Sequence, residues 1–150
     1  MKNKIIVFKG LQPEFAVALA IRTRVFVDEQ RVPVELERDE FDSKATHVLV
    51  FCDNTAAATG RIFADADIAG LWRLGRVAVL PEFRGTGLGK IVVNELLRMV
   101  TGNSLCRRVA IHAQKRLIGW YATFGFVASG DEFLEAGIEH QEMYLDLDQS

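Results

Sequence analysis

A glycine-rich loop is the segment of this chain whose residue types and spacing most directly suggest chemistry. It reads Arg-Gly-Thr-Gly-Leu-Gly-Lys over residues 84–90, and the segment after it carries its apolar residues on one helical face. Because glycine has no Cβ, successive amides can point into one concavity, and the start of the helix adds unpaired N–H groups and a positive dipole end. The loop therefore predicts an anion site, with phosphate as its natural ligand. A turn that merely caps the helix is the alternative.

Two common phosphate motifs do not fit this loop. In a Walker A motif, Arg84 would stand where the first glycine belongs and Ile91 would replace the serine or threonine. In a dinucleotide fingerprint starting at Gly85, the third glycine would fall on Lys90, and no compact strand–helix–strand unit opens the chain. A phosphate-loop nucleotide binder is therefore disfavoured.

The spacing Arg-x-x-Gly-x-Gly, formed by Arg84, Gly87 and Gly89, resembles the loop of the GNAT superfamily of N-acetyltransferases. Residues 76–84 are similar to the family's strand-into-loop segment, and residues 120–126, Trp-Tyr-Ala-Thr-Phe-Gly-Phe, resemble the end of the helix after its fifth strand. Phe-Val-Asp-Glu-Gln at residues 26–30 resembles a small bacterial branch called ElaA-like. The resemblance implies a GNAT-like α/β fold: one domain over residues 1–150, with a mixed, mostly antiparallel central sheet flanked by helices.

The same resemblance implies acetyl-CoA as the acyl-donor cosubstrate and no metal. In the family, the CoA pyrophosphate lies on the loop amides and the pantetheine arm pairs with the preceding strand. The implied pyrophosphate contacts are Arg84, Gly85, Thr86, Gly87, Leu88, Gly89 and Lys90. The implied pantetheine and acetyl contacts are Val77, Ala78 and Val79. We expect a backbone N–H near Val79 to stabilise the oxyanion of a tetrahedral intermediate.

Acetyl transfer to an amine also needs a proton donor for the departing thiolate. The resemblance implies that Tyr121 has this role, which suits a phenol that is protonated at neutral pH. A tyrosine packed at a helix end, without a catalytic role, is the alternative.

The reaction must also remove a proton from the attacking ammonium group. Many family members carry a glutamate on the fourth strand as the base, whereas this strand has Arg73 and Arg76. His112 is our first candidate base, with Glu29 and Glu40 as alternatives. A histidine that only hydrogen-bonds near the core is the competing interpretation for His112.

Acidic residues gather in two segments that the resemblance places near the acceptor groove. They are Glu29, Glu35, Glu37 and Glu40, and Asp131, Glu132, Glu135 and Glu139. Such a surface could attract a cationic amine, with Glu29 and Glu40 as predicted acceptor-binding residues. A solvated face is the alternative for any one of them. A polyamine, an aminoglycoside-like base and a peptide amine all fit, so the acceptor remains a small-molecule or peptide amine.

Composition limits the other classes of function. With 150 residues, 49% apolar and 25% charged, the chain has the size and mixture of one globular domain. The net charge of −2 and the scattered Lys and Arg residues disfavour nucleic-acid binding. No segment has the length of a signal peptide or a membrane span, so we expect a cytoplasmic protein without a membrane partner. Cys52 and Cys106 are expected to be buried thiols.

The hydrophobic pattern alternates between strands and helices. Expected strands cover residues 5–8, 47–52, 57–64, 72–80, 107–113 and 140–147, with a short apolar segment at 126–128. Expected helices run from Pro13 to Phe26, from Leu88 to a stop at Gly102, and over residues 116–124. Residues 31–43 are dense in acidic side chains and are predicted to form an exposed loop or short helix.

Two functional hypotheses follow. The first is an N-acetyltransferase that moves an acetyl group to a primary amine by direct attack. The second is a non-catalytic acyl-CoA sensor or interaction module, which the missing strand glutamate favours and Tyr121 disfavours. A homodimer that buries Trp72 and Trp120 is a further expectation.

Overall fold

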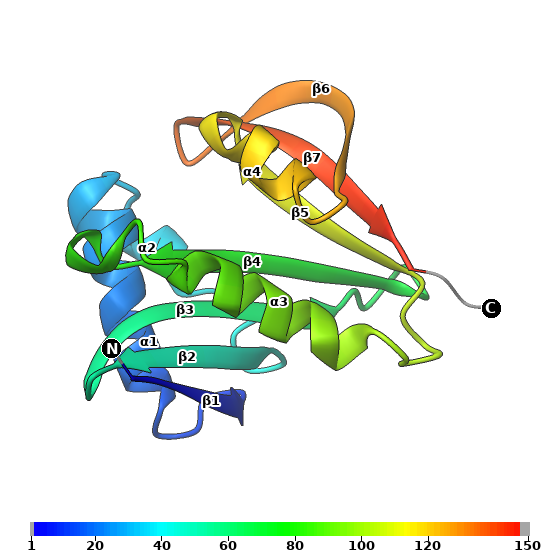
Figure 1. Cartoon of the computed structure of the whole chain (residues 1–150). Coiled ribbons are helices and arrows are strands. Elements are labelled where there is room, and N and C mark those ends of the chain that lie inside the picture. The colour runs from blue at the N-terminus through cyan, green and yellow to red at the C-terminus, as the bar shows by residue number, and fades with distance from the viewer. Residues whose placement is uncertain (1, 148–150) are drawn as a thin grey trace.

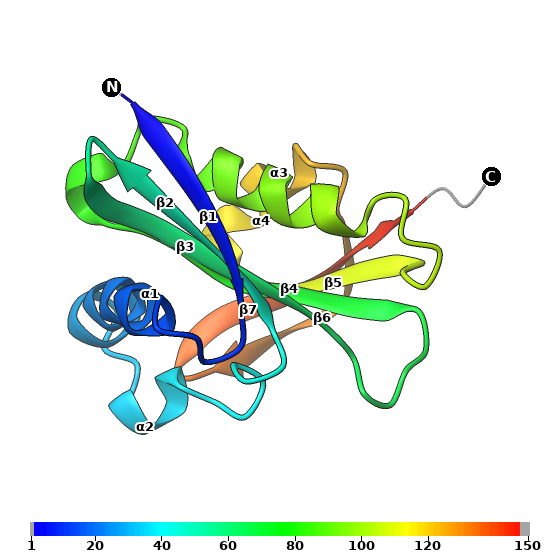
Figure 2. The ribbon, with the colours of Figure 1, turned by 90° about the horizontal axis from the view of Figure 1, so that it is seen from below.

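A seven-stranded sheet forms the centre of the computed structural model, which describes residues 2–147. The strand order is β1-β2-β3-β4-β5-β7-β6, and only β4 and β5 run parallel to each other. Helices α1 and α2 lie on one face of the sheet and α3 and α4 on the other (Figures 1 and 2). The predicted α/β class, with a mixed and mostly antiparallel sheet between helices, is confirmed.

The elements lie close to their predicted positions, apart from the last hairpin. The strands are β1 (Asn3–Lys9), β2 (Thr46–Cys52), β3 (Thr55–Ala64), β4 (Leu71–Val79), β5 (Arg108–Gln114), β6 (Val127–Glu135) and β7 (Ile138–Asp146). The helices are α1 (Phe15–Arg22), which continues as a π-helix (Thr23–Glu29), α2 (Val34–Glu37), α3 (Leu88–Val100) and α4 (Ile118–Ala122), with 3₁₀ turns at Pro81–Phe83 and Lys115–Leu117. None of these helices is long and apolar enough to cross a membrane.

Strand β6 is much longer than the short apolar segment expected at 126–128. It is an edge strand, and nearly all of its residues are exposed. Backbone pairing with β7 holds it in place, from Val127 opposite Tyr144 to Glu135 opposite Ile138. Because neither face is buried, its sequence carries no alternation of apolar residues that could have predicted it.

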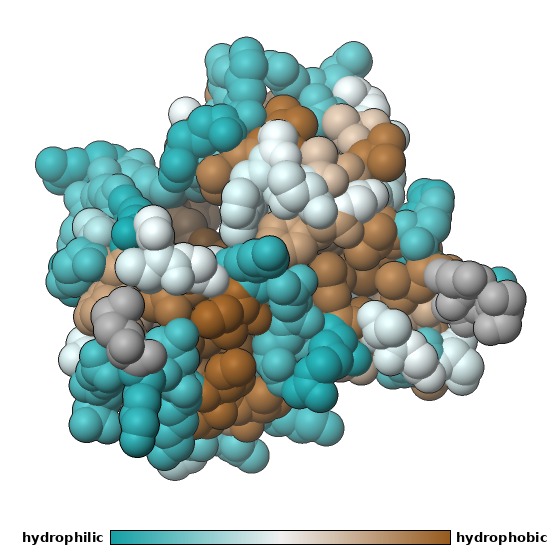
Figure 3. Space-filling view, in the orientation of Figure 1, coloured by the Kyte–Doolittle hydropathy of each residue, from teal (hydrophilic) through white to brown (hydrophobic). Residues whose placement is uncertain are grey.

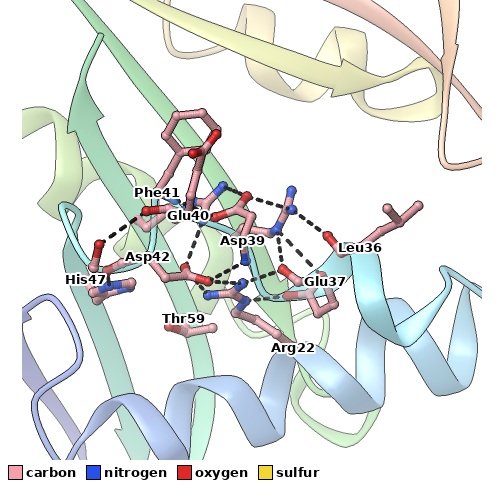
Figure 4. A network of polar contacts seen from close by, with 12 residues as sticks. Arg22, Leu36, Glu37, Asp39, Glu40, Phe41, Asp42, His47 and Thr59 are labelled. Atoms are coloured by element: carbon pink, nitrogen blue, oxygen red, sulfur yellow. Dashed lines mark hydrogen bonds and ion pairs between the residues drawn. The ribbon is translucent and has the colours of Figure 1, made fainter. Parts of the chain in front are cut away.

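The predicted exposure of the acidic segment is wrong for two of its residues. Glu37 and Asp42 are only 3% and 0% exposed, because both meet arginines from distant elements. Arg22 of α1 contacts both carboxylates, and its Nη1 lies 2.7 Å from an oxygen of Asp42. Arg61 of β3 lies 2.8 Å from the same oxygen, and Arg76 of β4 contacts Glu37. Figure 4 shows Glu37, Asp39 and Asp42 of the acidic segment gathered in one network of polar contacts with Arg22.

Strands β4 and β5 diverge, and this divergence makes room for a site. They pair only where Leu71–Arg73 faces Arg108–Ala110. Beyond that point the register of β4 against β3 is irregular, and Arg76 has a positive φ of 50°, which bends the strand. Figure 1 shows the two strands opening like a V toward the start of α3.

The core lies mainly between the sheet and α3. The apolar face of α3 is buried as predicted, through Leu88, Val92 and Leu96, and the helix ends just before Gly102. Cys52 and Cys106 are buried in the same core, as expected.

Candidate active site

The glycine loop has the geometry of an anion site. Gly85 and Gly87 have φ angles of +80° and +86°, and a Cβ built on either one would meet no other atom within 4 Å. The first bond of α3 at this end runs from the N–H of Ile91 to the carbonyl of Gly87, so the amides between them have no partner within the helix. Lys90 adds a cation to this exposed turn. The loop therefore fits a phosphate-bearing group such as CoA.

Two loop residues are explained by packing. The side chain of Leu88 is buried in the core, so only its backbone faces the loop. A Cβ on Gly89 would lie 3.3 Å from the ring of Trp120, and glycine thus lets α3 approach α4 closely. Thr86 donates a 2.6 Å hydrogen bond to the carbonyl of Phe83, which closes the turn.

Arg84 does not extend freely into solvent from this loop. Its Nη1 and Nη2 each lie 2.7 Å from an oxygen of Glu29, and its Nε donates to the carbonyl of Val79 at 3.0 Å. The hydrogen bonds from Arg84 hold the pKa of Glu29 below its ordinary value. Glu29, a predicted acceptor ligand and alternative base, thus contacts the glycine loop and is poorly suited to accept a proton.

The end of β4 presents backbone groups to the opening. The N–H of Leu80 donates to the carbonyl of Ala57, on the β3 side. In an extended, trans-peptide backbone, the carbonyl and N–H of Val79 then face away from β3, toward β5. The side chain of Ala78 is buried on the α1 side, and Val77 and Val79 pack toward α3. This edge is therefore suited to pair with an amide-bearing arm.

One cavity of about 400 Å³ occupies the opening between the strands. Val77 of β4 and Ala110 of β5 line it, together with His112 and Tyr121. The two predicted catalytic residues therefore share a cavity. In the space-filling view of this face, apolar residues lie deep in the opening and hydrophilic side chains surround it (Figure 3).

Tyr121 lies in α4, on the side of the cavity that faces the core. Its ring packs on Trp120 and Phe126, with centroids 4.9 and 6.0 Å away. Burial raises the pKa of Tyr121 well above its ordinary value, because the phenolate would lose its hydration. The phenol therefore stays protonated throughout the physiological pH range.

His112 lies on β5 and belongs to a cluster with the β6–β7 hairpin. Its Nδ1 is 3.0 Å from Glu135, its Nε2 is 3.6 Å from Glu142, and its ring meets the edge of Phe133. Glu135 also lies 3.7 Å from His140, and the hydrogen bond with His112 holds the pKa of Glu135 below its ordinary value. His112 is 36% exposed and has a carboxylate that can orient its ring. Sequence reasoning did not identify this cluster, because its members come from three strands.

The predicted acidic groove carries little uncompensated charge. Glu40 is exposed and lies outside the cavity lining, so its contact with an acceptor stays a prediction without structural support. Glu132 and Glu139 both lie 3.3 Å from Lys115. The cavity wall instead carries the arginines of β3 and β4. Trp72 and Trp120, the residues considered for a dimer interface, pack partly against the core.

Comparisons with known proteins agree with this geometry. Residues 11–147 match the family model for the acetyltransferase (GNAT) domain. YjcF of Bacillus subtilis, described as an uncharacterized N-acetyltransferase, is 33% identical over 130 residues, which cover 86% of this chain and 90% of that protein. A crystal structure of Escherichia coli ElaA superimposes with a TM-score of 0.85 at 26% identity, over 95% of this chain and 99% of that one. An acyl-CoA N-acyltransferase from Pseudomonas aeruginosa gives the same TM-score and coverage at 29% identity.

Proposed function

The chain belongs to the GNAT family of acyl-CoA N-acyltransferases, and from that premise we propose that it transfers an acetyl group from acetyl-CoA to a primary amine. The observation that carries this proposal is the single cavity that joins His112 and Tyr121 in the opening beside Val77 of β4. A binding module has no need for a histidine held by a carboxylate and a buried phenol in one cavity.

Acetyl-CoA supplies an electrophilic thioester carbonyl. In our proposal the loop amides of residues 85–90 and Lys90 hold its pyrophosphate, and the edge of β4 at Val77–Val79 that faces away from β3 holds its pantetheine arm. The side chain of Arg84 lies between the glycine loop and the end of β4, where its Nε donates to the carbonyl of Val79. These residues position the carbonyl in the opening between β4 and β5.

Three groups of the chain then act on the reacting atoms. His112, oriented by Glu135, removes a proton from the acceptor ammonium so that the amine can attack the carbonyl carbon. The N–H of Val79 stabilises the oxyanion of the tetrahedral intermediate. As the new C–N bond forms and the C–S bond breaks, Tyr121 donates its proton toward the departing sulfur. The acceptor nitrogen loses two protons in all: His112 takes the first and passes it to solvent, and the second, lost as the tetrahedral intermediate collapses, replaces the proton that Tyr121 gives to the thiol.

The alternative is a non-catalytic acyl-CoA sensor or interaction module. It is favoured by the arginines of β4, Arg73 and Arg76, which stand where many relatives carry the base. Under this hypothesis acetyl-CoA binds but no amine is acetylated.

Calorimetric titration with acetyl-CoA, followed by a thiol-release assay with a panel of amines, distinguishes the two hypotheses. We expect binding, and turnover with at least one amine. Binding without turnover by any amine would favour the sensor, and lack of binding would contradict both.

A further inference from the structure

The wall of the cavity that β4 contributes is rich in unused guanidinium donors. Arg73 and Arg76 both line the cavity, and their side chains are 31% and 27% exposed. Arg73 uses its Nε to contact Asp65 at 2.8 Å, and no other contact of its guanidinium is found within residues 2–147. Arg76 uses Nε and Nη2 for the carbonyls of residues 37 and 36 and for Asp39. An arginine has five N–H donors, so both have donors to spare.

The carboxylates that line the same cavity are already occupied. Asp39 receives hydrogen bonds from Arg61 and Arg76, at 2.6 to 3.1 Å. Glu37 contacts Arg76 and, from behind, the buried Arg22. The third, Glu135, contacts His112 across the cavity. The cavity wall at β4 therefore has unused guanidinium N–H donors, whereas the carboxylates that line the cavity already accept hydrogen bonds or form ion pairs.

Burial also disfavours the charged form of Arg76, although its carboxylate neighbours match the arginines in number. Burial and repulsion from Arg61 lower the pKa of Arg76, despite the attraction of Glu37 and Asp39. Arg61 is itself only 5% exposed, and within residues 2–147 its Nε is the one buried side-chain N or O atom without a hydrogen-bond partner. An added anion would satisfy donors and favour the charged form of Arg76 at the same time.

We propose that the acceptor is a free amino acid or a similar amino carboxylate, whose carboxylate binds Arg73 and Arg76 while its amine faces His112. This inference rests on the proposed acetyl transfer and specifies its substrate class. A planar carboxylate matches the fork of a guanidinium group, and the arginines and His112 line one cavity of about 400 Å³. Phe26, Phe41 and Phe63 line the remainder, so an apolar side chain would be accommodated.

Matched pairs of acceptors test this proposal. Phenylalanine and phenethylamine differ by one carboxylate, as do leucine and 3-methylbutylamine. We expect the wild-type chain to acetylate the amino acid with the higher kcat/KM in each pair. In Arg73→Gln this preference should fall about 10- to 100-fold, since a hydrogen bond to a charged group is lost, while kcat/KM for the simple amine stays within about twofold.

Three variants separate charge recognition from folding. Arg73→Lys should recover only part of the preference, because an ammonium lacks the planar fork. Arg76→Gln should reduce the preference as well. Arg108→Gln is the matched control, since Arg108 also pairs with an aspartate, Asp146, but lies outside the cavity lining and should leave the preference unchanged.

The outcomes distinguish this inference from the proposed function. If simple amines are acetylated as well as their amino acids, or if Arg73→Gln leaves the preference intact, the carboxylate site is wrong although the chain remains an acetyltransferase. A preference for O-phosphoethanolamine over β-alanine would show a phosphate site and also overturn the proposal. If no amine is turned over, the proposed function fails. Calorimetric titration of the CoA-loaded chain with the amino acids then tests the carboxylate site separately. Binding of the amino acids would support the site, and absence of binding would exclude it.

Discussion

Glu29 and Arg84 form a two-pronged ion pair, with both N–O distances at 2.7 Å, between the end of the π-helix and the glycine loop. The π-helix also contributes Phe26 to the cavity wall. One contact therefore links the segment beside the predicted acceptor cavity to the loop that is predicted to hold the pyrophosphate.

Replacing Glu29 tests the electrostatics of this loop. Glu29→Gln removes a negative charge near the phosphate site, so we expect acetyl-CoA to bind about two- to fivefold more tightly, as for a partly exposed ion pair. Titration calorimetry at low and high salt measures the change, which should shrink at high salt. Asp146→Asn breaks a comparable Arg–carboxylate pair away from the loop and serves as control. Weaker binding by Glu29→Gln would mean that Glu29 mainly orients Arg84.

A Cβ at Gly87 should weaken acetyl-CoA binding more than tenfold. Gly87 and Gly102 both have a φ of +86° and open space around them, so alanine at either position costs a similar backbone strain of about 1 kcal/mol. Only Gly87 lies at the predicted anion site. Gly87→Ala and Gly102→Ala are therefore compared for Tm and for acetyl-CoA affinity. Equal affinities of the two variants for acetyl-CoA would show that Gly87 does not lie in the binding site.

Tyr121→Phe removes a proton donor and little volume. We expect kcat to fall about 10- to 100-fold while acetyl-CoA affinity changes little, which steady-state kinetics and calorimetry measure together. Tyr144→Phe is the matched comparison at the other of the chain's 2 tyrosines, which does not line the cavity; because its hydroxyl donates to Glu142, it also reports any effect that reaches His112 through Glu142. An unchanged kcat at saturating acceptor would show that Tyr121 is not the general acid and contributes only to packing.

His112→Gln should lower kcat/KM for the acceptor about 100-fold, because it removes the proposed base from the cavity. Glu135→Gln should have a smaller effect in the same direction, since Glu135 acts only by holding the ring of His112. Glu132→Gln, on the same strand but paired with Lys115, is the control for the hairpin. Full activity of His112→Gln would show that His112 is not the general base.

The free energy of unfolding should depend on pH through the carboxyl group of Asp42. Its burial opposes ionisation, but the hydrogen bonds and charge of Arg22 outweigh burial and hold its pKa at about 2, below 3.8. A lowered carboxyl pKa stabilises the fold above about pH 4, and this contribution disappears as the pH falls through about 2. The shift corresponds to about 2 kcal/mol. The stability difference between wild type and Asp42→Asn, from urea unfolding at several pH values, should therefore shrink on acidification. A difference independent of pH would contradict this linkage.

Local signals in the sequence were enough to predict the fold, and they also single out the glycine loop as a predicted anion site. The spacing of Gly85, Gly87 and Gly89 before an amphipathic helix depends on backbone freedom and helix periodicity, which act over a few neighbouring residues. The same holds for most strand positions, where alternation of apolar residues reports one buried face. The resemblance carried by residues 76–90 and 120–126 extended these signals to a family whose membership the comparisons show.

Only the tertiary structure decided how the charged side chains are used. Glu37 and Asp42 look like members of an exposed acidic run, yet they are buried because Arg22 and Arg61 reach them from α1 and β3. Glu29, a predicted acceptor-binding residue, pairs with Arg84, which is 55 residues away in the sequence. A pairing of this kind depends on which elements the sheet brings together, and no local pattern encodes it.

The cavity likewise arises only when the chain is folded. The divergence of β4 from β5 after Arg73 opens it, and His112, Tyr121 and Glu135 reach it from three separate elements. The sequence by itself therefore determined the fold class, the elements and the predicted anion loop, since these depend on local conformational preference and periodic burial. The tertiary structure decided which titratable groups share a cavity, because long-range packing alone sets their distances and their exposure to water.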